Sequence, residues 1–467
     1  MYIYSAKMVD QLTHLIHQFT EPEQKKLLDF VTSPYFNKRP ELIQLTELIL
    51  KDPSGKIEKE EVWKVLFRGI EFEDVKLRLL KSDLMKLVET FISLEEAGEL
   101  TSLRQLLRLK EKLRGRNLKK RYKAADRRQE RLTSEAPAGV EWSWLQYELE
   151  RESVQYKIGQ RSTKRQDFAG LNQLLDQCYL LESLRMACLG LANQTIDPGQ
   201  LEFQSLRNAL SKPDFEHSLS ENEVLAQYYY CYLMLSRPDD YSAFEKFMMG
   251  LEKLKYWSKQ EARDLVLLAV NYCIRRVNAG DRAAGGQALD LYQFGLDQNL
   301  LQDNGKLSRF TFNNIVALAL QSRNIDRAAK FVNYYADQIS PAFRQSTVAL
   351  NLARLYYERG LLNEAIEQLQ GAKDQDVLTT LNIRVLQLRV YQQLAEQRLF
   401  DSSLDALDIY LRRRKDGLDY HYKAYRKLVS YLRRFRRLNR HDAGQVENFK
   451  DLVLQEVGLP EKSWLLK

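Results

Sequence analysis

The chain has few of the residues that interrupt helices. Glycine occurs 20 times and proline 10 times among 467 residues, which together is about 6% of the chain and about half of the usual share. Runs of alternating β-branched residues long enough for a strand are missing too. Leucine, glutamine, arginine, glutamate and alanine are abundant instead, and these residues favour helices. The sequence therefore predicts an all-α fold.

Long apolar runs and paired cysteines are also absent. The longest apolar runs, such as residues 228–235, are much shorter than the roughly 18 residues that cross a bilayer as a helix. The first residues lack the apolar segment and cleavage site of a signal peptide. Cys178, Cys188, Cys231 and Cys273 are widely spaced without a C-x-x-C pattern, which is typical of buried free thiols in a reducing compartment. We expect a cytoplasmic protein.

Motifs for catalysis and metal binding are missing as well. The sequence has no phosphate-cradling glycine-rich loop, nucleophile elbow or H-E-x-x-H pattern. His14 and His17 would share a helix face, but no third or fourth ligand follows at a fitting spacing, so surface or core histidines explain them better. The carboxylates are dispersed among lysines and arginines, as on solvated helix faces. We expect no enzyme activity, no cofactor and no metal.

The positive charge is concentrated in two segments. Residues 104–131 contain 13 Lys/Arg and 3 Asp/Glu, and residues 412–440 contain 12 and 2. Each segment carries +10, so the remainder of the chain carries −12 within a net charge of +8. Such concentration indicates an acidic partner, which is another molecule or the acidic part of the chain itself.

Small residues recur at regular intervals in the second half of the chain. Two consecutive helical hairpins over residues 310–372 align with each other, and they place Ala328 and Ala365 37 positions apart. A small residue is needed where the two helices of a hairpin cross. Ala288 lies 40 positions before Ala328, and Ser403 lies 38 positions after Ala365. This pattern resembles the tetratricopeptide repeat, whose period is about 34 residues, and it predicts an α-solenoid of stacked hairpins.

The predicted solenoid occupies only part of the chain. Near the start, Thr20 and Glu23 form a capping box that opens a helix, and Pro40 suits the first turn of the next one. Short helices of this kind indicate a bundle. The predicted segments are an N-terminal helical bundle (1–99), a long basic helix and a loop (100–140), degenerate helical hairpin repeats (141–309), tetratricopeptide-like repeats (310–440) and a C-terminal cap (441–467).

Four phrases of the sequence occur together in a known group of proteins. They are SPYFNK (33–38), NYCIRR (271–276), NGKLSRFTFNNIV (304–316) and YLRRRK (410–415). With the repeat pattern, they resemble a bacterial family of tetratricopeptide-like α-helical repeat proteins over nearly the whole chain. The resemblance implies the repeat fold and a cytoplasmic setting, and it implies no catalytic residue.

Asparagine and arginine side chains define a candidate groove on the repeats. Asn314 and Asn351 each lie two residues before the aligned residues Val316 and Ala353, so the alignment gives them equivalent positions. An asparagine both donates and accepts, which suits the backbone of a bound peptide. Asparagines that cap or bridge adjacent helices are the alternative. The candidate partner groove comprises Asn314, Asn351, Arg354 and Arg389.

The two basic segments define a second candidate surface. In the first, basic residues follow at steps of three or four, which places them on one stripe of a single helix over about 100–132. In the second, they lie on one side of an amphipathic helix over about 419–440. The candidate basic surface comprises Arg104, Arg108, Lys112, Arg116, Lys119, Lys123, Arg127, Arg131, Arg426, Arg433, Arg437 and Arg440.

These features favour a non-enzymatic scaffold or adaptor. We expect it to bind a protein partner through its helical-repeat groove, with the basic helices contacting an acidic partner. The alternative is a nucleic-acid or ribonucleoprotein-associated protein whose basic helices, 104–131 and 412–440, contact phosphates. A third explanation is that acidic faces of the chain itself dock against these helices. The sequence predicts no membrane span.

Overall fold

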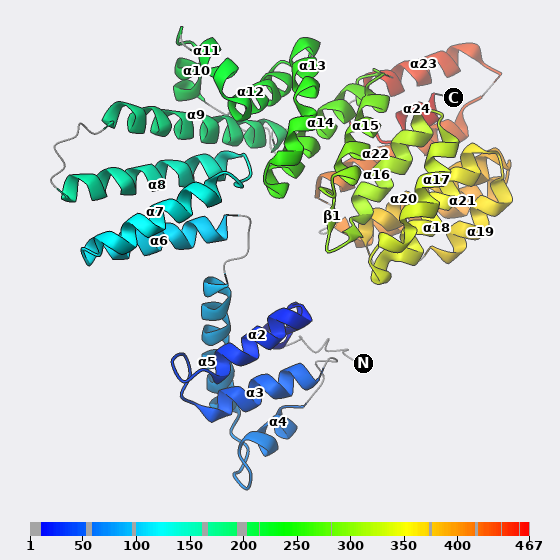
Figure 1. Ribbon diagram of the computed structural model, residues 1–467. Helices are drawn as coiled ribbons and strands as arrows, with labels where there is room; N and C mark the ends of the chain where they lie inside the picture. Colours follow the sequence, from blue (N-terminus) through cyan, green and yellow to red (C-terminus); the bar gives the residue numbers. More distant parts are fainter. Residues whose placement is uncertain are drawn as a thin grey trace. The chain divides into compact units, whose positions relative to one another are not determined.

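The computed structural model is helical almost throughout (Figure 1), with 80% helix and 1% strand. This confirms the all-α prediction. The four cysteines are buried free thiols, also as predicted. The structure describes residues 11–52, 58–95, 100–160, 167–193, 203–213, 215–281, 283–372, 376–415, 419–439, 441–456 and 458–466.

The chain divides into two compact units, Met1–Ala136 and Pro137–Lys467. In the first unit, the helices up to α5 enclose one hydrophobic core, in which Trp63 and Leu84 are buried. The capping box is present, because the Thr20 backbone N–H donates to Glu23 at 2.7 Å. The helices of this unit are α1 (Gln11–His17), α2 (Glu21–Thr32), α3 (Pro40–Lys51), α4 (Lys59–Leu66), α5 (Asp74–Leu94), α6 (Thr101–Gly115) and α7 (Lys119–Thr133).

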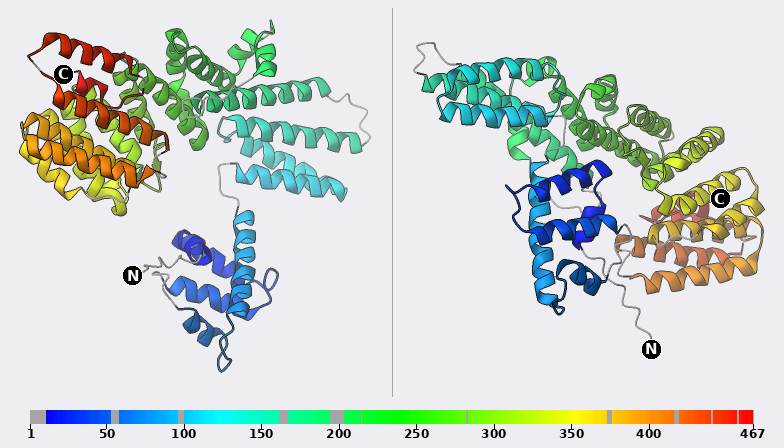
Figure 2. Two further views of the ribbon diagram at one scale, coloured as in Figure 1. Left: turned by 180° about the vertical axis from the view of Figure 1, so that it is seen from behind. Right: turned by 60° about the horizontal axis from the view of Figure 1, so that its bottom comes forward.

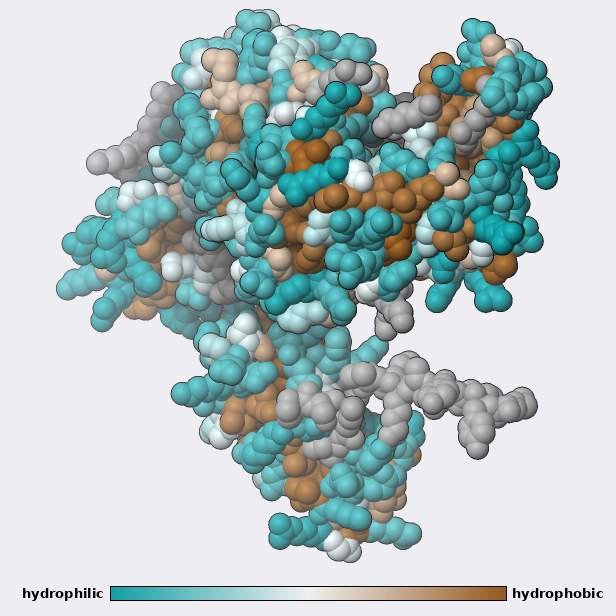
Figure 3. All heavy atoms as spheres, turned by 90° about the vertical axis from the view of Figure 1, so that its right-hand side faces the viewer, coloured by the Kyte–Doolittle hydropathy of each residue, from teal (hydrophilic) through white to brown (hydrophobic). Residues whose placement is uncertain are grey.

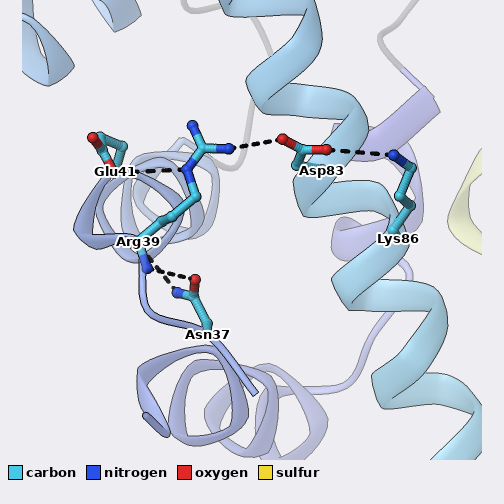
Figure 4. Close-up of polar contacts among 5 residues, drawn as sticks. All are labelled: Asn37, Arg39, Glu41, Asp83 and Lys86. Carbon is cyan, nitrogen blue, oxygen red and sulfur yellow. Dashed lines mark hydrogen bonds and ion pairs between the residues drawn. The ribbon is translucent and has the colours of Figure 1, made fainter. Parts of the chain in front are cut away.

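Polar contacts fix the start of α3 in the bundle (Figure 4). The Asn37 side chain accepts from the backbone N–H of Arg39 at 2.8 Å and donates to the carbonyl of Val31 at 2.9 Å. The Arg39 guanidinium then donates to Asp83 of α5 at 2.7 Å. Together these contacts join the turn before α3 to both α2 and α5.

The predicted single helix over 100–132 is wrong, because the chain turns back on itself after Gly115. α6 ends there and α7 begins at Lys119, and Asn117 between them has a left-handed φ of 57°. The two helices pack against each other, and Tyr122 and Ala125 of α7 are buried. Because α6 and α7 fold back on each other, the face of α7 with Tyr122 and Ala125 is removed from water. On a single projecting helix this face would stay exposed.

The second unit consists of helices and one two-stranded hairpin. The hairpin is antiparallel, and its strands β1 (Gln302–Asp303) and β2 (Lys306–Leu307) meet at an Asn304-Gly305 turn. The first elements are α8 (Val140–Gly159), α9 (Phe168–Asn193), α10 (Gln204–Leu210), α11 (Phe215–Glu221), α12 (Glu223–Ser236), α13 (Tyr241–Met249), η1 (Leu251–Tyr256), α14 (Lys259–Asn278) and α15 (Ala283–Asp297). After the strands follow α16 (Arg309–Gln321), α17 (Ile325–Tyr335), η2 (Ala336–Gln338), α18 (Pro341–Glu358), α19 (Leu362–Gly371), α20 (Val377–Gln393), α21 (Gln397–Arg413), α22 (Asp419–Arg437), α23 (Ala443–Gln455) and α24 (Lys462–Leu465).

Consecutive helices of the second unit pack against each other, among them α14 with α15, α16 with α17, α18 with α19 and α20 with α21 (Figure 2). The predicted small residues Ala288, Ala328 and Ala365 are each 0% exposed, which confirms that these positions are closed. Ser403 differs, because it is half-buried and the neighbouring Leu404 is buried in its place.

The closed positions lead to a stability prediction. Replacing Ala365 with Phe should lower the free energy of unfolding by about 1–3 kcal/mol, because a large side chain overpacks a site without free space. Ala317 on α16 is exposed, so the same change there should shift stability by no more than about 0.5 kcal/mol. Chemical denaturation of both variants measures the difference, and equal stability would mean that the crossing at Ala365 tolerates a ring.

A buried carboxylate joins the starts of α8 and α14. Glu261 is buried and accepts the backbone N–H groups of Val140 at 2.8 Å and Glu141 at 3.1 Å. It also accepts the hydroxyl of Tyr228 at 3.0 Å. Gly139 has a φ of 146°, and a Cβ there would lie 2.6 Å from the carboxylate. Glu261 therefore serves as the acceptor for orphan donors of a helix that begins 121 residues earlier.

The last helices differ from the predicted bounds. α22 ends at Arg437, and Arg440 lies outside the described residues. Ala443 and Gly444 form the first turn of α23. Asp442 caps that turn by accepting the backbone N–H of Gln445 at 3.0 Å.

The surface of the molecule is mainly polar on the face shown in Figure 3, where hydrophobic side chains gather only in smaller patches. Within the described ranges, every helix is too short or too polar to cross a membrane.

Candidate binding surfaces

The α6–α7 hairpin carries a dense set of exposed cations. Arg104, Arg108 and Arg114 make other contacts and Lys110 is buried, so these four are left out of this set. The remaining side chains are exposed, and none has a carboxylate partner among the described residues. We define the basic hairpin surface as Lys112, Arg116, Lys119, Lys120, Arg121, Lys123, Arg127, Arg128 and Arg131.

A buried lysine removes one of the few carboxylates from this surface. The side chain of Lys110 is 0% exposed and its Nζ lies 2.8 Å from Asp126 of α7. The same ammonium donates to Gln129 at 2.6 Å and lies 5.0 Å from the ring centre of Tyr122. Asp126 is paired with Lys110 inside the hairpin, so its negative charge neutralises the buried ammonium and not the exposed cations.

The second basic helix is mostly neutralised within the chain. Its arginines face aspartates of α21: Arg433 contacts Asp405 at 3.0 Å, and Arg436 contacts Asp401 at 2.8 Å. The hydrogen bond and charge of Arg436 lower the pKa of Asp401, so this pair is ionised at neutral pH. Asp408 is buried and also contacts Arg412, Arg426 and Arg433.

The acidic face of α21 therefore accounts for two of the four residues of the predicted basic surface on α22. Arg426 and Arg433 are parts of an intramolecular ion-pair network and do not form a free stripe. Arg437 is exposed and has no carboxylate partner in the part of the chain that the structure describes. Arg440 cannot be placed, since it lies outside that part.

The predicted pair of equivalent asparagines is wrong. The Asn351 side chain is 0% exposed, so it does not line an open groove. Its amide donates to Asn313 at 2.5 Å and to the carbonyl of Thr347 at 2.8 Å. Asn314 is exposed and donates to the hydroxyl of Tyr292 at 3.4 Å. Asn351 thus bridges adjacent helices, whereas Asn314 lies on a different side.

The two arginines of the predicted groove do lie together, with two acidic residues beside Arg389. Arg389 on α20 contacts Glu358 at 3.7 Å and Glu461 at 3.3 Å, and it lies 4.5 Å from the ring centre of Tyr357. Arg354 on α18 donates to Asn351 at 3.2 Å. Burial lowers the pKa of Arg354, and the charge of Glu461 opposes this effect. Sequence reasoning found both arginines and missed Glu461.

A separate pocket of about 940 Å³ lies between α15, α16 and α17. Its wall includes Tyr292, Phe331 and Tyr334, and Tyr334 is 74% exposed. Asp297 and Lys330 add charge at its edge. Periodicity gave no sign of this pocket, because it depends on how consecutive helices are offset.

Groups suited to catalysis are not apparent in the described parts of the chain. No cluster of three or more His, Cys, Asp or Glu residues there could hold a metal ion. Burial raises the pKa of the Cys178 thiol to about 11 and that of Cys273 to about 12. Both thiols therefore stay protonated at neutral pH and are poor nucleophiles.

Comparison with known proteins adds no assignment. No family model, curated protein or solved structure matches the chain.

Proposed function

We propose that the protein is a non-enzymatic cytoplasmic scaffold that binds nucleic acid through the basic hairpin surface. The observation that carries this proposal is the set of nine exposed cations without a carboxylate partner among the described residues. Such a surface attracts phosphates, and binding releases the counterions that surround the nucleic acid. The stacked hairpins of the second unit, a tetratricopeptide-like solenoid in this proposal, provide the scaffold.

The composition of the hairpin favours phosphates over an acidic protein. Protein interfaces usually bury an apolar centre that is depleted in charge, whereas the exposed part of this hairpin is mainly lysine and arginine. Leu109 and Leu118 are the exposed large apolar side chains on its described part. Tyr122 is 1% exposed, so it is not available for base stacking. We therefore expect contacts to the backbone and little sequence preference.

Salt dependence tests the proposal. If between half and all of the nine cations each contact one phosphate, the slope of log affinity against log salt on duplex should be about −4 to −8. Fluorescence anisotropy with labelled RNA and DNA duplexes, measured over a range of potassium chloride concentrations, gives this slope. A slope near zero, or no binding at low salt, would contradict the proposal.

A protein partner bound by the helical repeats is the second candidate. The observation in its favour is the pocket between α15 and α17, whose wall combines aromatic rings with charged residues at the edge. Exposed tyrosine in a concave site is typical of interaction surfaces. Replacing Tyr334 with Ala should reduce recovery of a partner in affinity purification without changing stability, because this side chain is largely in solvent.

A further inference from the structure

The arginines Arg354 and Arg389 face a segment that arrives from the far end of the chain. This segment, defined here as the 459–465 segment, follows α23 and includes α24, which lies among the last helices in Figure 1. Its Glu461 contacts Arg389 at 3.3 Å. Its Trp464 indole N–H donates to the side-chain oxygen of Gln392 on α20. The segment therefore reaches α20 through one carboxylate and one indole.

Apolar side chains anchor the same segment in a hydrophobic core. Leu459, Trp464 and Leu465 are buried in a core shared with α20, α21, α22 and α23. Glu461, which holds the carboxylate, has a left-handed φ of 56°, a conformation that costs free energy for any residue other than glycine. The segment is thus bound as a short peptide would be, by an anchor ring and a charge, with some backbone strain.

The segment brings one carboxylate to two arginines, and the second carboxylate of the site, Glu358 on α18, contacts Arg389. Arg354 has no carboxylate within ion-pair distance among the described residues. Glu461 contacts Arg389, and its charge acts on Arg354 only over a longer distance. The carboxylate oxygens of Glu461 and Glu358 lie 3.3 and 3.7 Å from Arg389, which is longer than a well-formed charge-assisted hydrogen bond. Its Nε is buried and has no acceptor. A carboxylate placed across the guanidinium would use this donor as well.

We propose that α18, α20 and α22 form a binding site for a partner peptide that carries a carboxylate three residues before a Trp-Leu pair, and that the 459–465 segment is its replaceable internal occupant. The internal segment shows which chemistry the site accepts: an acidic side chain for the arginines and an indole for Gln392. A partner with a better-placed carboxylate displaces it. This site shares no residue with the basic hairpin surface, so the two proposals stand or fall separately.

A labelled peptide of residues 456–466 tests the exchange on the full-length protein. The wild type should bind it weakly, because the tethered segment competes at a high effective concentration. Changing Glu461 to Arg in the protein repels the internal segment from both arginines, so the peptide should bind at least about tenfold more tightly. Trp464→Ala removes the indole ring that anchors the segment, so it should also increase the affinity for the labelled peptide. Anisotropy measures affinity, and thermal unfolding confirms that each variant is folded.

The assignment of the site needs matched controls. In the Glu461→Arg background, Arg389→Gln should abolish peptide binding, whereas Arg359→Gln, at an exposed arginine just after α18, should not. A peptide with Gln in place of Glu461 should also fail to bind. Equal affinity for the wild type and both release variants, or retained binding in Arg389→Gln, would overturn the proposal and make the segment a permanent part of the fold.

Discussion

Changing Arg116, Lys119, Lys123 and Arg127 to glutamate should abolish nucleic-acid binding at physiological salt. The four changes alter the net charge of the basic hairpin surface by eight units, from +9 to +1. At roughly 1 kcal/mol for each cation near an anionic surface, the affinity should fall at least about a hundredfold. The slope of the salt dependence should become flatter, since fewer counterions are released. Anisotropy on one RNA and one DNA duplex provides both values.

The fold should survive this change. All four side chains are exposed and have no carboxylate partner among the described residues. Lys119 is the first residue of α7, where a glutamate interacts favourably with the helix dipole. The circular dichroism spectrum and the unfolding temperature should therefore stay close to those of the wild type.

A second quadruple variant separates the hairpin from total charge. Arg413, Arg414, Lys415 and Arg437 are also exposed and have no carboxylate partner in the described ranges. Changing these four to glutamate gives the same net charge as the hairpin variant, but leaves the hairpin intact. It should keep most of the binding. Equal loss in both variants would show that binding follows net charge and not the hairpin, and would reject the hairpin as the site.

The break inside the basic segment was visible in the sequence but was obscured by a stronger pattern. Glycine and asparagine are the residue types that most often end a helix. Gly115 and Asn117 are of these types, and Asn117 does adopt the left-handed conformation. The cations continue at steps of three or four across this point, so their spacing predicted one helix. Apart from Arg104, which is half-buried, the residues selected by this spacing are exposed on both helices. It did not reveal that a pair of helices carries them.

The error at Asn351 has a similar origin. Counting 37 residues back from Asn351 gives Asn314, whereas its hydrogen-bond partner is Asn313, 38 residues back. Loop lengths between hairpins vary by a few residues, and a shift of one residue turns a helical side chain by about 100°. That rotation is enough to exchange an exposed position for a buried one. Ala328 and Ala365 are both buried although the spacing between the hairpins varies.

Sequence patterns could not predict the contacts between distant segments. The Glu461 contact to Arg389 joins residues 72 positions apart, and the Glu261 contact to Val140 joins residues 121 positions apart. In the sequence, Glu261 is one of many glutamates near a helix start. Its local pattern predicts a cap within its own helix, and Ser258 does accept the N–H of Glu261 at 3.4 Å. Nothing in that pattern indicates the start of α8.

Replacing Glu261 with Ala should therefore destabilise the second unit strongly. The change leaves three donors without their acceptor: the backbone N–H groups of Val140 and Glu141 and the hydroxyl of Tyr228. A buried donor without a partner costs about 1–3 kcal/mol, so the total loss should be about 3 kcal/mol or more. Burial and the neighbouring carboxylate raise the pKa of Tyr228, so its hydroxyl remains a donor throughout the usual pH range.

Two matched variants connect this loss to the hydrogen bonds. Glu252→Ala removes an exposed glutamate from η1 and should change stability by no more than about 0.5 kcal/mol. Tyr228→Phe removes one of the three donors, so it should cost less in the Glu261→Ala protein than in the wild type. Chemical denaturation gives these values, and hydrogen exchange at Val140 and Glu141 should speed up in Glu261→Ala. Unchanged exchange at both amides would mean that the carboxylate does not hold the start of α8.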